Sequence, residues 1–255
     1  MMSVQAGGMY LYAVLASTQG VGELGSIGVE GGEVYCVSAG DITAAVSRVS
    51  RTRLRPERKH LLAHQTVLRR LMEQGTVLPA AFGLVARSEA AVRERLLEKG
   101  ALFREQLEHV AGKVEMGLRV SWSAPELFEY FVATHSELGA ARERLRGRSD
   151  VGREELIGVG KLFESIREAD REAHSERVAA ALRECGAELK WNPPRGEREV
   201  MNLSCLVPRE GLGAFEKQVE LAAAGFDDHF TFELNGPWAP HSFTELKPTT
   251  LSAQE

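Results

Sequence analysis

The sequence predicts an α+β protein of two domains: an N-terminal α+β domain over residues 1–111 and a C-terminal modified ferredoxin-like (βαββαβ) domain over residues 112–255, with an enlarged helical crossover. The length of 255 residues suits one or two domains of roughly 150 residues each. Short apolar runs typical of strands alternate with longer segments in which apolar residues recur every three or four positions. From residue 113 the order is strand, helices, strand, strand, helix, strand, which is the split βαβ arrangement.

The N-terminal domain is expected to begin with a buried strand over residues 9–16. This run resembles a signal-peptide core, but a signal needs a positively charged start and the first basic residue is Arg48. A flexible Gly-rich loop over 20–32 and a hairpin of strands 34–38 and 42–46 follow. The remaining elements expected are a helix over 56–73, a short apolar segment over 77–82, and one helix over 88–110 with Ser88 as its N-cap. Pro79 indicates that the segment 77–82 is an edge strand or a bulge and not a central strand.

The C-terminal domain is expected to begin with a strand over 113–122 that has one face buried, because apolar and polar or small residues alternate there. A capping box, Ser123-Ala-Pro-Glu126, predicts that a helix starts directly after it. Acidic and basic residues are interleaved over 137–184, and pairs such as Glu164–Arg167 and Glu168–Arg171 indicate solvated helix faces. The other elements expected are a loop over 147–152, strands over 187–191, 200–207 and 230–234, and a helix over 212–223.

The composition excludes several function classes. With 31 Lys and Arg against 36 Asp and Glu, the net charge is −5, which argues against nucleic acid as a partner because phosphate neutralisation needs a dense basic face. No apolar run approaches the ~18 residues of a membrane span, so no lipid membrane is expected as a partner. Three widely spaced cysteines (Cys36, Cys185 and Cys205) suit buried, inert thiols and a reducing cytoplasm.

Two Gly-rich motifs resemble nucleotide sites but lack a required part. Gly20-Val-Gly-Glu-Leu-Gly25 follows a strand, but the next residues cannot start the helix whose N-terminus would bind a pyrophosphate. Gly158-Val-Gly-Lys161 resembles the end of a phosphate-binding loop, but Leu162 stands where Ser or Thr would bind magnesium. We therefore expect no nucleotide and no other cofactor.

A metal site and a catalytic nucleophile are not expected either. His60 and His64 have the i,i+4 spacing of metal ligands, but Leu61 stands where a zinc protease has its general base. We expect one of these histidines to be exposed and the other to lie at the rim of the core. No Ser or Cys stands in a strand–turn–helix elbow, and nothing in the sequence demands an enzyme.

The C-terminal motif, defined here as residues 236–243, stands out. Pro237 and Pro240 stiffen the backbone after Gly236, while Trp238 and Phe243 offer large apolar faces at little entropy cost. The motif is either a staple buried over the core or an anchor for a partner. On physical grounds alone we favour the staple.

At these residues the chain resembles the GvpL/GvpF family of gas vesicle synthesis proteins over nearly its whole length. The matching motifs are Tyr10-Leu-Tyr-Ala-Val14, Gly40–Val46, His64-Gln, Val77-Leu-Pro79, Phe82-Gly83, Gly158–Lys161, Met201-Asn202-Leu203, and Phe232–Phe243, of which the last is the most specific. The resemblance implies structural roles for His64, Pro79, Phe82, Gly83 and Asn202.

The resemblance also implies a two-domain α+β fold and a non-enzymatic role in gas vesicle assembly, in the cytoplasm and at the vesicle. It implies as partners the small, hydrophobic shell protein and other accessory proteins, with residues 236–243 contributing to the shell-protein contact. The alternatives are a small-molecule-binding enzyme and a regulatory module on a ferredoxin-like sheet. A pocket with a perturbed acid–base pair would favour the enzyme.

Overall fold

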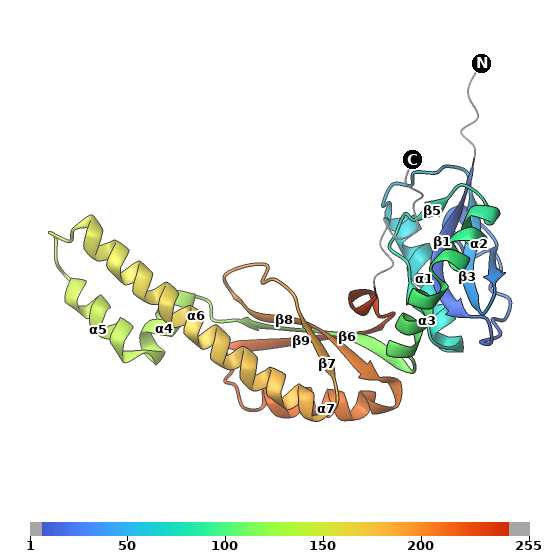
Figure 1. The fold of residues 1–255 in the computed structure, drawn as a ribbon. Coiled ribbons are helices and arrows are strands. Elements are labelled where there is room, and N and C mark those ends of the chain that lie inside the picture. The colour runs from blue at the N-terminus through green and yellow to red at the C-terminus, as the bar shows by residue number, and fades with distance from the viewer. Residues whose placement is uncertain (1–6, 245–255) are drawn as a thin grey trace, which may run out of the picture. The chain divides into compact units, whose positions relative to one another are not determined.

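The computed structural model describes residues 7–244, which form a mixed helix and sheet fold with two antiparallel sheets (Figure 1). The chain divides into two compact units. The described parts of Met1–Glu115 and Pro237–Glu255 form the first unit, and Met116–Gly236 forms the second. The sequence predicts that all residues after 111 belong to one domain. The structure instead assigns residues 237–244 to the first unit. Ser242 binds Glu115, and the His241 ring lies beside His64 in the helix Arg58–Gln74.

The first unit is built around a five-stranded sheet in which β2, β3, β1 and β4 are neighbours in that order and β5 also pairs with β1. Its elements are β1 (Gly8–Ala16), the 3₁₀ helix η1 (Val29–Gly31), β2 (Val34–Ala39), β3 (Ile42–Val49), α1 (Arg58–Gln74), β4 (Leu78–Pro79), β5 (Val85–Ala86), α2 (Glu89–Glu98) and α3 (Gly100–His109). β1 is central, and all but its last residue are buried. This explains why its sequence is a continuous apolar run.

Several expectations for the first unit are confirmed. β2 and β3 form the expected hairpin, with Ala39 opposite Ile42 and Gly40 at φ 64° in the turn. Pro79 lies in β4 at the end of the sheet path, where a missing backbone N–H does no harm. Ser88 caps α2, since its Oγ accepts the N–H of Ala91 at 3.2 Å.

The expectation of one helix over 88–110 is wrong. The structure has two helices, α2 and α3, which meet at Lys99 with φ −104° and ψ 12°. Gly100 follows this residue, and glycine weakens the interior of a helix. The break lets both helices turn apolar side chains toward the core, including Leu96 and Phe103.

The second unit contains a four-stranded sheet in which β7, β8, β6 and β9 are neighbours in that order. The elements from here to the end of the described chain are β6 (Lys113–Trp122), α4 (Leu127–Thr134), α5 (Ser136–Leu145), α6 (Arg153–Glu184), β7 (Glu188–Trp191), β8 (Glu199–Pro208), η2 (Arg209–Gly211), α7 (Leu212–Ala223), β9 (Phe230–Trp238) and η3 (His241–Phe243). In Figure 1, α6 and α7 lie on the same side of this sheet. Their apolar residues and those of the strands form one core that includes Trp122, Phe131 and Phe215.

Two expectations about the helices of the second unit need correction. Ser123 does not cap α4: its N–H donates to the carbonyl of His229 and the N-cap residue is Glu126, because Ser123 continues the pairing of β6. The loop expected over 147–152 is confirmed between α5 and α6. The faces that carry Arg167 and Arg171 are not solvated, since these side chains are only 9% and 15% exposed.

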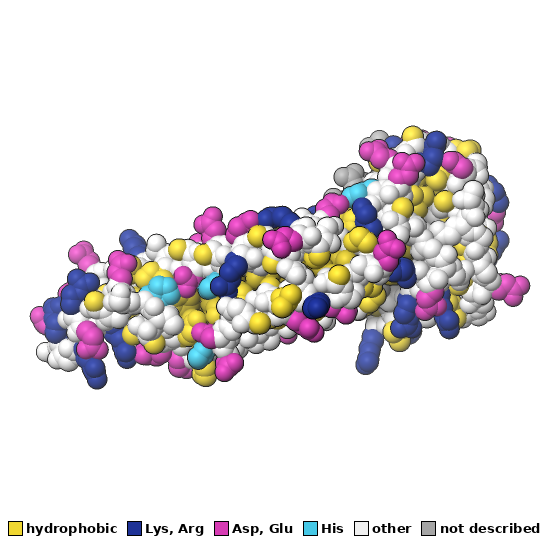
Figure 2. Space-filling model, turned by 90° about the horizontal axis from the view of Figure 1, so that it is seen from below, with side chains coloured by type: hydrophobic (Ala, Val, Ile, Leu, Met, Phe, Trp, Pro, Cys, Tyr) yellow, Lys and Arg dark blue, Asp and Glu magenta, His cyan; other side chains and the backbone are white. Residues whose placement is uncertain are grey.

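The outer surface of the second unit is nevertheless mixed in charge. Figure 2, which views the molecule from the side of α6 and α7, shows acidic and basic side chains interspersed with apolar ones. Among residues 7–244, no helix is both long and apolar enough to cross a membrane.

Candidate functional site

A hydrogen-bonded pair at the centre of the first unit brings together residues that the sequence analysis singled out separately. Tyr10 of β1 and His64 of α1 are both buried, and the Tyr10 hydroxyl lies 2.9 Å from His64 Nδ1. The same hydroxyl accepts the backbone N–H of Gly83 at 3.1 Å. We infer that the hydroxyl donates its own proton to Nδ1, because it already serves as the acceptor for Gly83.

Aromatic rings surround this pair. Phe82 lies edge-on to both Tyr10 and His64, with ring centroids 6.0 and 5.8 Å away, and the Tyr12 ring stacks on His64 at 5.8 Å. Three of the motif residues, His64, Phe82 and Gly83, thus meet around one tyrosine hydroxyl. Pro79 lies nearby in β4, opposite Ala13 of β1. We call Tyr10, Tyr12, His64 and Phe82 the tyrosine–histidine cluster.

Burial controls the ionisation of this cluster. It lowers the pKa of His64 to about 4, with a smaller contribution from the positive charge that His241 carries when protonated. Burial also raises the pKa of the Tyr10 hydroxyl above its ordinary value. At neutral pH both groups are therefore uncharged, and the hydrogen bond between them acts as a packing contact.

The C-terminal motif ends beside this cluster. The His241 ring in η3 lies 6.5 Å from the His64 ring. Next to it, Ser242 donates its N–H and its hydroxyl to the two carboxylate oxygens of Glu115, at 2.7 and 2.6 Å. Glu115 is only 8% exposed. Glu115 could not be singled out from the sequence. It stands at a polar position of a strand in which apolar and polar residues alternate, and the side chain at such a position normally faces solvent.

The five proposed partner-binding residues differ in exposure. Gly236 has φ 129°, which glycine tolerates, and Pro237 is exposed. The Trp238 side chain is 50% exposed, so the staple that the sequence favoured is wrong for this residue. Pro240 is buried and Phe243 is half-buried. The motif therefore places the Trp238 indole between Pro237, which is exposed and has a restricted backbone, and Pro240, which is buried.

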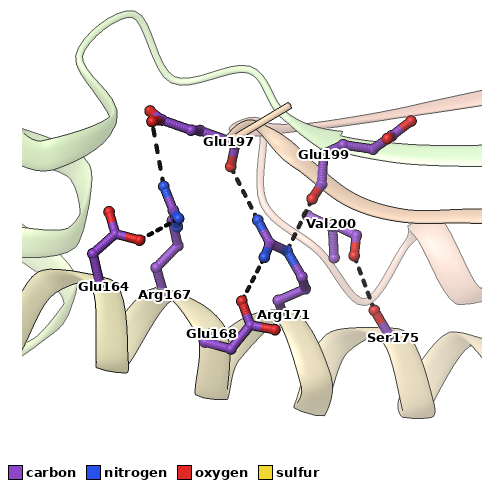
Figure 3. A network of polar contacts seen from close by, with 8 residues as sticks. All are labelled: Glu164, Arg167, Glu168, Arg171, Ser175, Glu197, Glu199 and Val200. Carbon is purple, nitrogen blue, oxygen red and sulfur yellow. Dashed lines mark hydrogen bonds and ion pairs between the residues drawn. The ribbon is translucent and has the colours of Figure 1, made fainter. Parts of the chain in front are cut away.

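Asn202, the fifth motif residue, lies in the second unit on β8. Its carbonyl accepts the N–H of Asn192 at 2.8 Å, and its side chain lines a groove of about 800 Å³ beside α6. One arginine of α6 binds the neighbouring backbone, and a second pairs with side-chain carboxylates. Arg171 donates to the carbonyls of Glu199 and Glu197, and Arg167 pairs with Glu164, as Figure 3 shows.

The motifs considered for cofactors occupy other surroundings. Gly20 to Gly25 lie in a loop that no α-helix follows, since the next elements are η1 and β2, and Gly158 to Lys161 lie inside α6. Neither His60 nor His64 is exposed, which corrects the expectation of one exposed histidine. Within residues 7–244, no group of three or more His, Cys, Asp or Glu side chains is arranged to hold a metal ion. Of the cysteines, Cys205 is buried as expected, whereas Cys36 is exposed.

Comparison with known proteins gives consistent results. The sequence profile of the family described as "Gas vesicle synthesis protein GvpL/GvpF" matches residues 8–245. Gas vesicle protein F of Nostoc sp. is 26% identical over 243 residues, which cover 94% of this chain and 98% of that protein. Gas vesicle protein L of Streptomyces sp. is 29% identical over 262 residues, covering 93% and 92%. The crystal structure of GvpF from Anabaena sp. matches with a TM-score of 0.82 at 26% identity, covering 93% of this chain and 98% of that one.

Proposed function

Because the chain belongs to the GvpL/GvpF family of gas vesicle synthesis proteins, we propose that it is a non-enzymatic assembly protein that binds the hydrophobic protein of the gas vesicle shell. Its role in gas vesicle assembly follows from the family. The shell-protein contact, the absence of catalysis and a location in the cytoplasm and at the vesicle are parts of the proposal, as is binding to other accessory proteins.

The geometry of the C-terminal motif is the observation that supports this contact most directly. Half of the Trp238 side chain is exposed, although tryptophan is usually well buried in a folded protein. Its neighbours fix its position: Pro237 restricts the backbone before it, and Ala239 and Pro240 are buried after it. An exposed aromatic side chain on a rigid backbone loses little entropy when a partner covers it, and such residues often dominate binding.

Attachment of the motif to the first unit supports the same proposal. The two hydrogen bonds from Ser242 to Glu115 hold the residues that follow Trp238. A motif that was free in solution would have to be ordered upon binding, at a cost in affinity. Here the protein fold provides that order in advance.

The tyrosine–histidine cluster supports a structural rather than a catalytic role. A general base must reach its substrate and have a pKa near the working pH. His64 is 2% exposed and its pKa is about 4, so it meets neither condition. We assign it, with Phe82 and Gly83, to the packing of β1 against α1.

We further propose that the second unit is a modified ferredoxin-like domain. Its elements follow the order β6, three helices, β7, β8, α7, β9, and the strands are neighbours in the order β7-β8-β6-β9. In a βαββαβ chain this order places the first and third strands at the centre of the sheet. Helices α4 and α5 together with α6 form the enlarged crossover between the first two strands.

Co-expression with the shell protein tests the proposed contact. Wild-type protein and a Trp238→Ala variant, each carrying an affinity tag, are purified with the shell protein and the bound shell protein is quantified. We expect the variant to lose most of the bound shell protein while keeping its melting temperature, because half of the side chain is already exposed. Leu97→Ala is the matched control, since Leu97 is 67% exposed in the same unit. If Trp238→Ala and Leu97→Ala bound equal amounts of shell protein, Trp238 would not contribute to the contact.

A further inference from the structure

The groove beside α6 is lined by residues of α6, of the end of β7 and the turn after it, and of β8. It lies wholly in the second unit, has a volume of about 800 Å³, and its lining includes Glu172, Trp191, Asn192, Pro194 and Asn202. We propose that this groove binds an extended basic segment of a partner protein, with an Arg or Lys side chain of that segment placed at the Glu172 carboxylate and the Trp191 indole. The proposal does not depend on the shell-protein contact of the C-terminal motif.

The walls of the groove are held in place by side chain–backbone hydrogen bonds between α6 and β8. Arg171 donates from Nε to the carbonyl of Glu199 at 3.1 Å and from Nη2 to that of Glu197 at 3.3 Å. One turn further along α6, the hydroxyl of Ser175 donates to the carbonyl of Val200 at 3.1 Å. Figure 3 shows these side chains pointing from α6 to the same stretch of backbone. The groove is therefore formed before any partner arrives, which lowers the cost of binding.

The charge left available in the groove is negative. Arg171 lines it but is only 15% exposed, and its third nitrogen pairs with Glu168 at 2.5 Å. Glu176 is paired with Arg183 at 2.6 Å. Glu172 has no hydrogen-bond or ion-pair partner among residues 7–244, so its carboxylate is free to meet a cation. A cationic side chain is thus the complement of this surface.

An aromatic face and a free amide accompany the free carboxylate. Trp191 ends β7, is 47% exposed, and contacts no other ring or cation within the described chain. An indole face attracts the guanidinium of Arg or the ammonium of Lys. The side-chain amide of Asn202 is also unpaired in residues 7–244 and offers both a donor and an acceptor for a peptide backbone. Carboxylate, indole and amide together suit a cationic residue within an extended chain.

Binding of a synthetic peptide to the full-length protein tests the proposal. The probe is a capped, fluorophore-labelled peptide, Gly-Ser-Leu-Arg-Leu-Ser-Gly, and the readout is its fluorescence anisotropy during titration with the protein. Matched peptides carry citrulline or Glu in place of Arg. We expect saturable binding of the Arg peptide only, weakened roughly tenfold by Trp191→Ala and about fivefold by Glu172→Gln. Glu220→Gln and Trp238→Ala are controls with less than a twofold effect.

Each other outcome overturns the proposal. If the citrulline peptide bound as tightly as the Arg peptide, the groove would recognise the shape of the side chain and not its charge. Unchanged affinity in Trp191→Ala and Glu172→Gln would place the peptide elsewhere, and absence of saturable binding by the Arg peptide would show that the groove does not take a basic segment. Melting temperatures within about 2 °C of wild type show that the variants are folded. Loss of shell-protein binding in Trp238→Ala with intact peptide binding separates this proposal from the proposed function.

Discussion

Ser242 contacts both oxygens of the Glu115 carboxylate, through its N–H at 2.7 Å and its hydroxyl at 2.6 Å. The two residues are 127 positions apart in the chain, yet they belong to the same compact unit. Hydrogen bonds to a charged acceptor are about twice as strong as those between neutral groups. This contact therefore contributes to fixing residues 239–243 on the first unit.

Glu115→Ala is expected to release these residues from the first unit. Removing the carboxylate deletes two charge-assisted hydrogen bonds and leaves the Ser242 N–H without this acceptor, at a cost of about 1.5–3 kcal/mol for each lost bond to a charged group. Hydrogen–deuterium exchange would show faster exchange at Ser242 and Phe243, with strands β1 and β3 unchanged. Ser242→Ala is the milder comparison, since it removes only the hydroxyl. Unaltered exchange in Glu115→Ala would mean that other contacts hold the motif.

Folding stability should decrease as the pH falls from about 6.5 to 4, with His64 as a main cause. The pKa of His64 is lowered from 6.5 in a free peptide to about 4 in the fold, so the unfolded chain takes up the proton first. The stabilisation is complete above about pH 6.5 and is lost toward pH 4. At about 1.4 kcal/mol per pKa unit it amounts to about 3 kcal/mol. Urea unfolding at several pH values measures it.

His64→Gln is the control for this pH dependence. Glutamine keeps a neutral acceptor for the Tyr10 hydroxyl but does not titrate. His174 and His241, whose pKa values are also lowered, mainly by burial, stay unchanged in the variant. The slope of stability against pH should therefore be smaller in His64→Gln. If the two slopes agreed, His64 would not be the group responsible.

The strands and the core were largely predictable from the sequence, because they depend on local patterns. A continuous apolar run identified β1 as a buried strand, and the Gly40 turn identified the β2–β3 hairpin. The break between α2 and α3 was missed, since a single glycine is compatible with a continuous helix. Boundaries of this kind depend on which face of each helix meets the core.

The site was less predictable because it depends on contacts between distant residues. The sequence singled out His64 and Phe82 as motif residues, but nothing in it indicated that both pack against Tyr10 and against each other. Charge spacing on α6 suggested solvated pairs and was misleading for Arg171. The Arg171 guanidinium donates to the backbone carbonyls of Glu197 and Glu199. Every residue has a backbone carbonyl, so the spacing of charged residues in the sequence cannot indicate such a contact.

The two members of the Glu168–Arg171 pair should respond very differently to mutation. Glu168 is 65% exposed, so Glu168→Gln is expected to change stability by about 0–1 kcal/mol. Arg171→Gln removes donors from the carbonyls of Glu197 and Glu199 and is expected to cost about 2–4 kcal/mol. Thermal unfolding of the two variants measures the difference. Equal, small effects would support the solvated helix face that the sequence alone suggested.

The Gly-rich stretch before β2 is expected to be sensitive at one glycine and tolerant at another. A Cβ at Gly28 would lie 2.5 Å from the carbonyl oxygen of Gly32 and 2.6 Å from the Tyr12 hydroxyl. That hydroxyl accepts the N–H of Val29 at 2.7 Å and lies 2.8 Å from Ser47 Oγ, so it cannot move aside without losing both contacts. Gly28→Ala should therefore destabilise the protein by about 1–3 kcal/mol, as overpacking does elsewhere.

Gly20→Ala is the matched control for this effect. Among residues 7–244, no atom outside the two adjacent residues lies within 4 Å of a Cβ at Gly20. The substitution should therefore be neutral or stabilise the fold by up to about 1 kcal/mol through the lower entropy of the unfolded chain. Chemical unfolding of both variants measures the contrast. If Gly28→Ala proved as stable as Gly20→Ala, the stretch would be the flexible loop that its composition suggests. A cost confined to Gly28 would show instead that Tyr12 fixes this segment against the central strand.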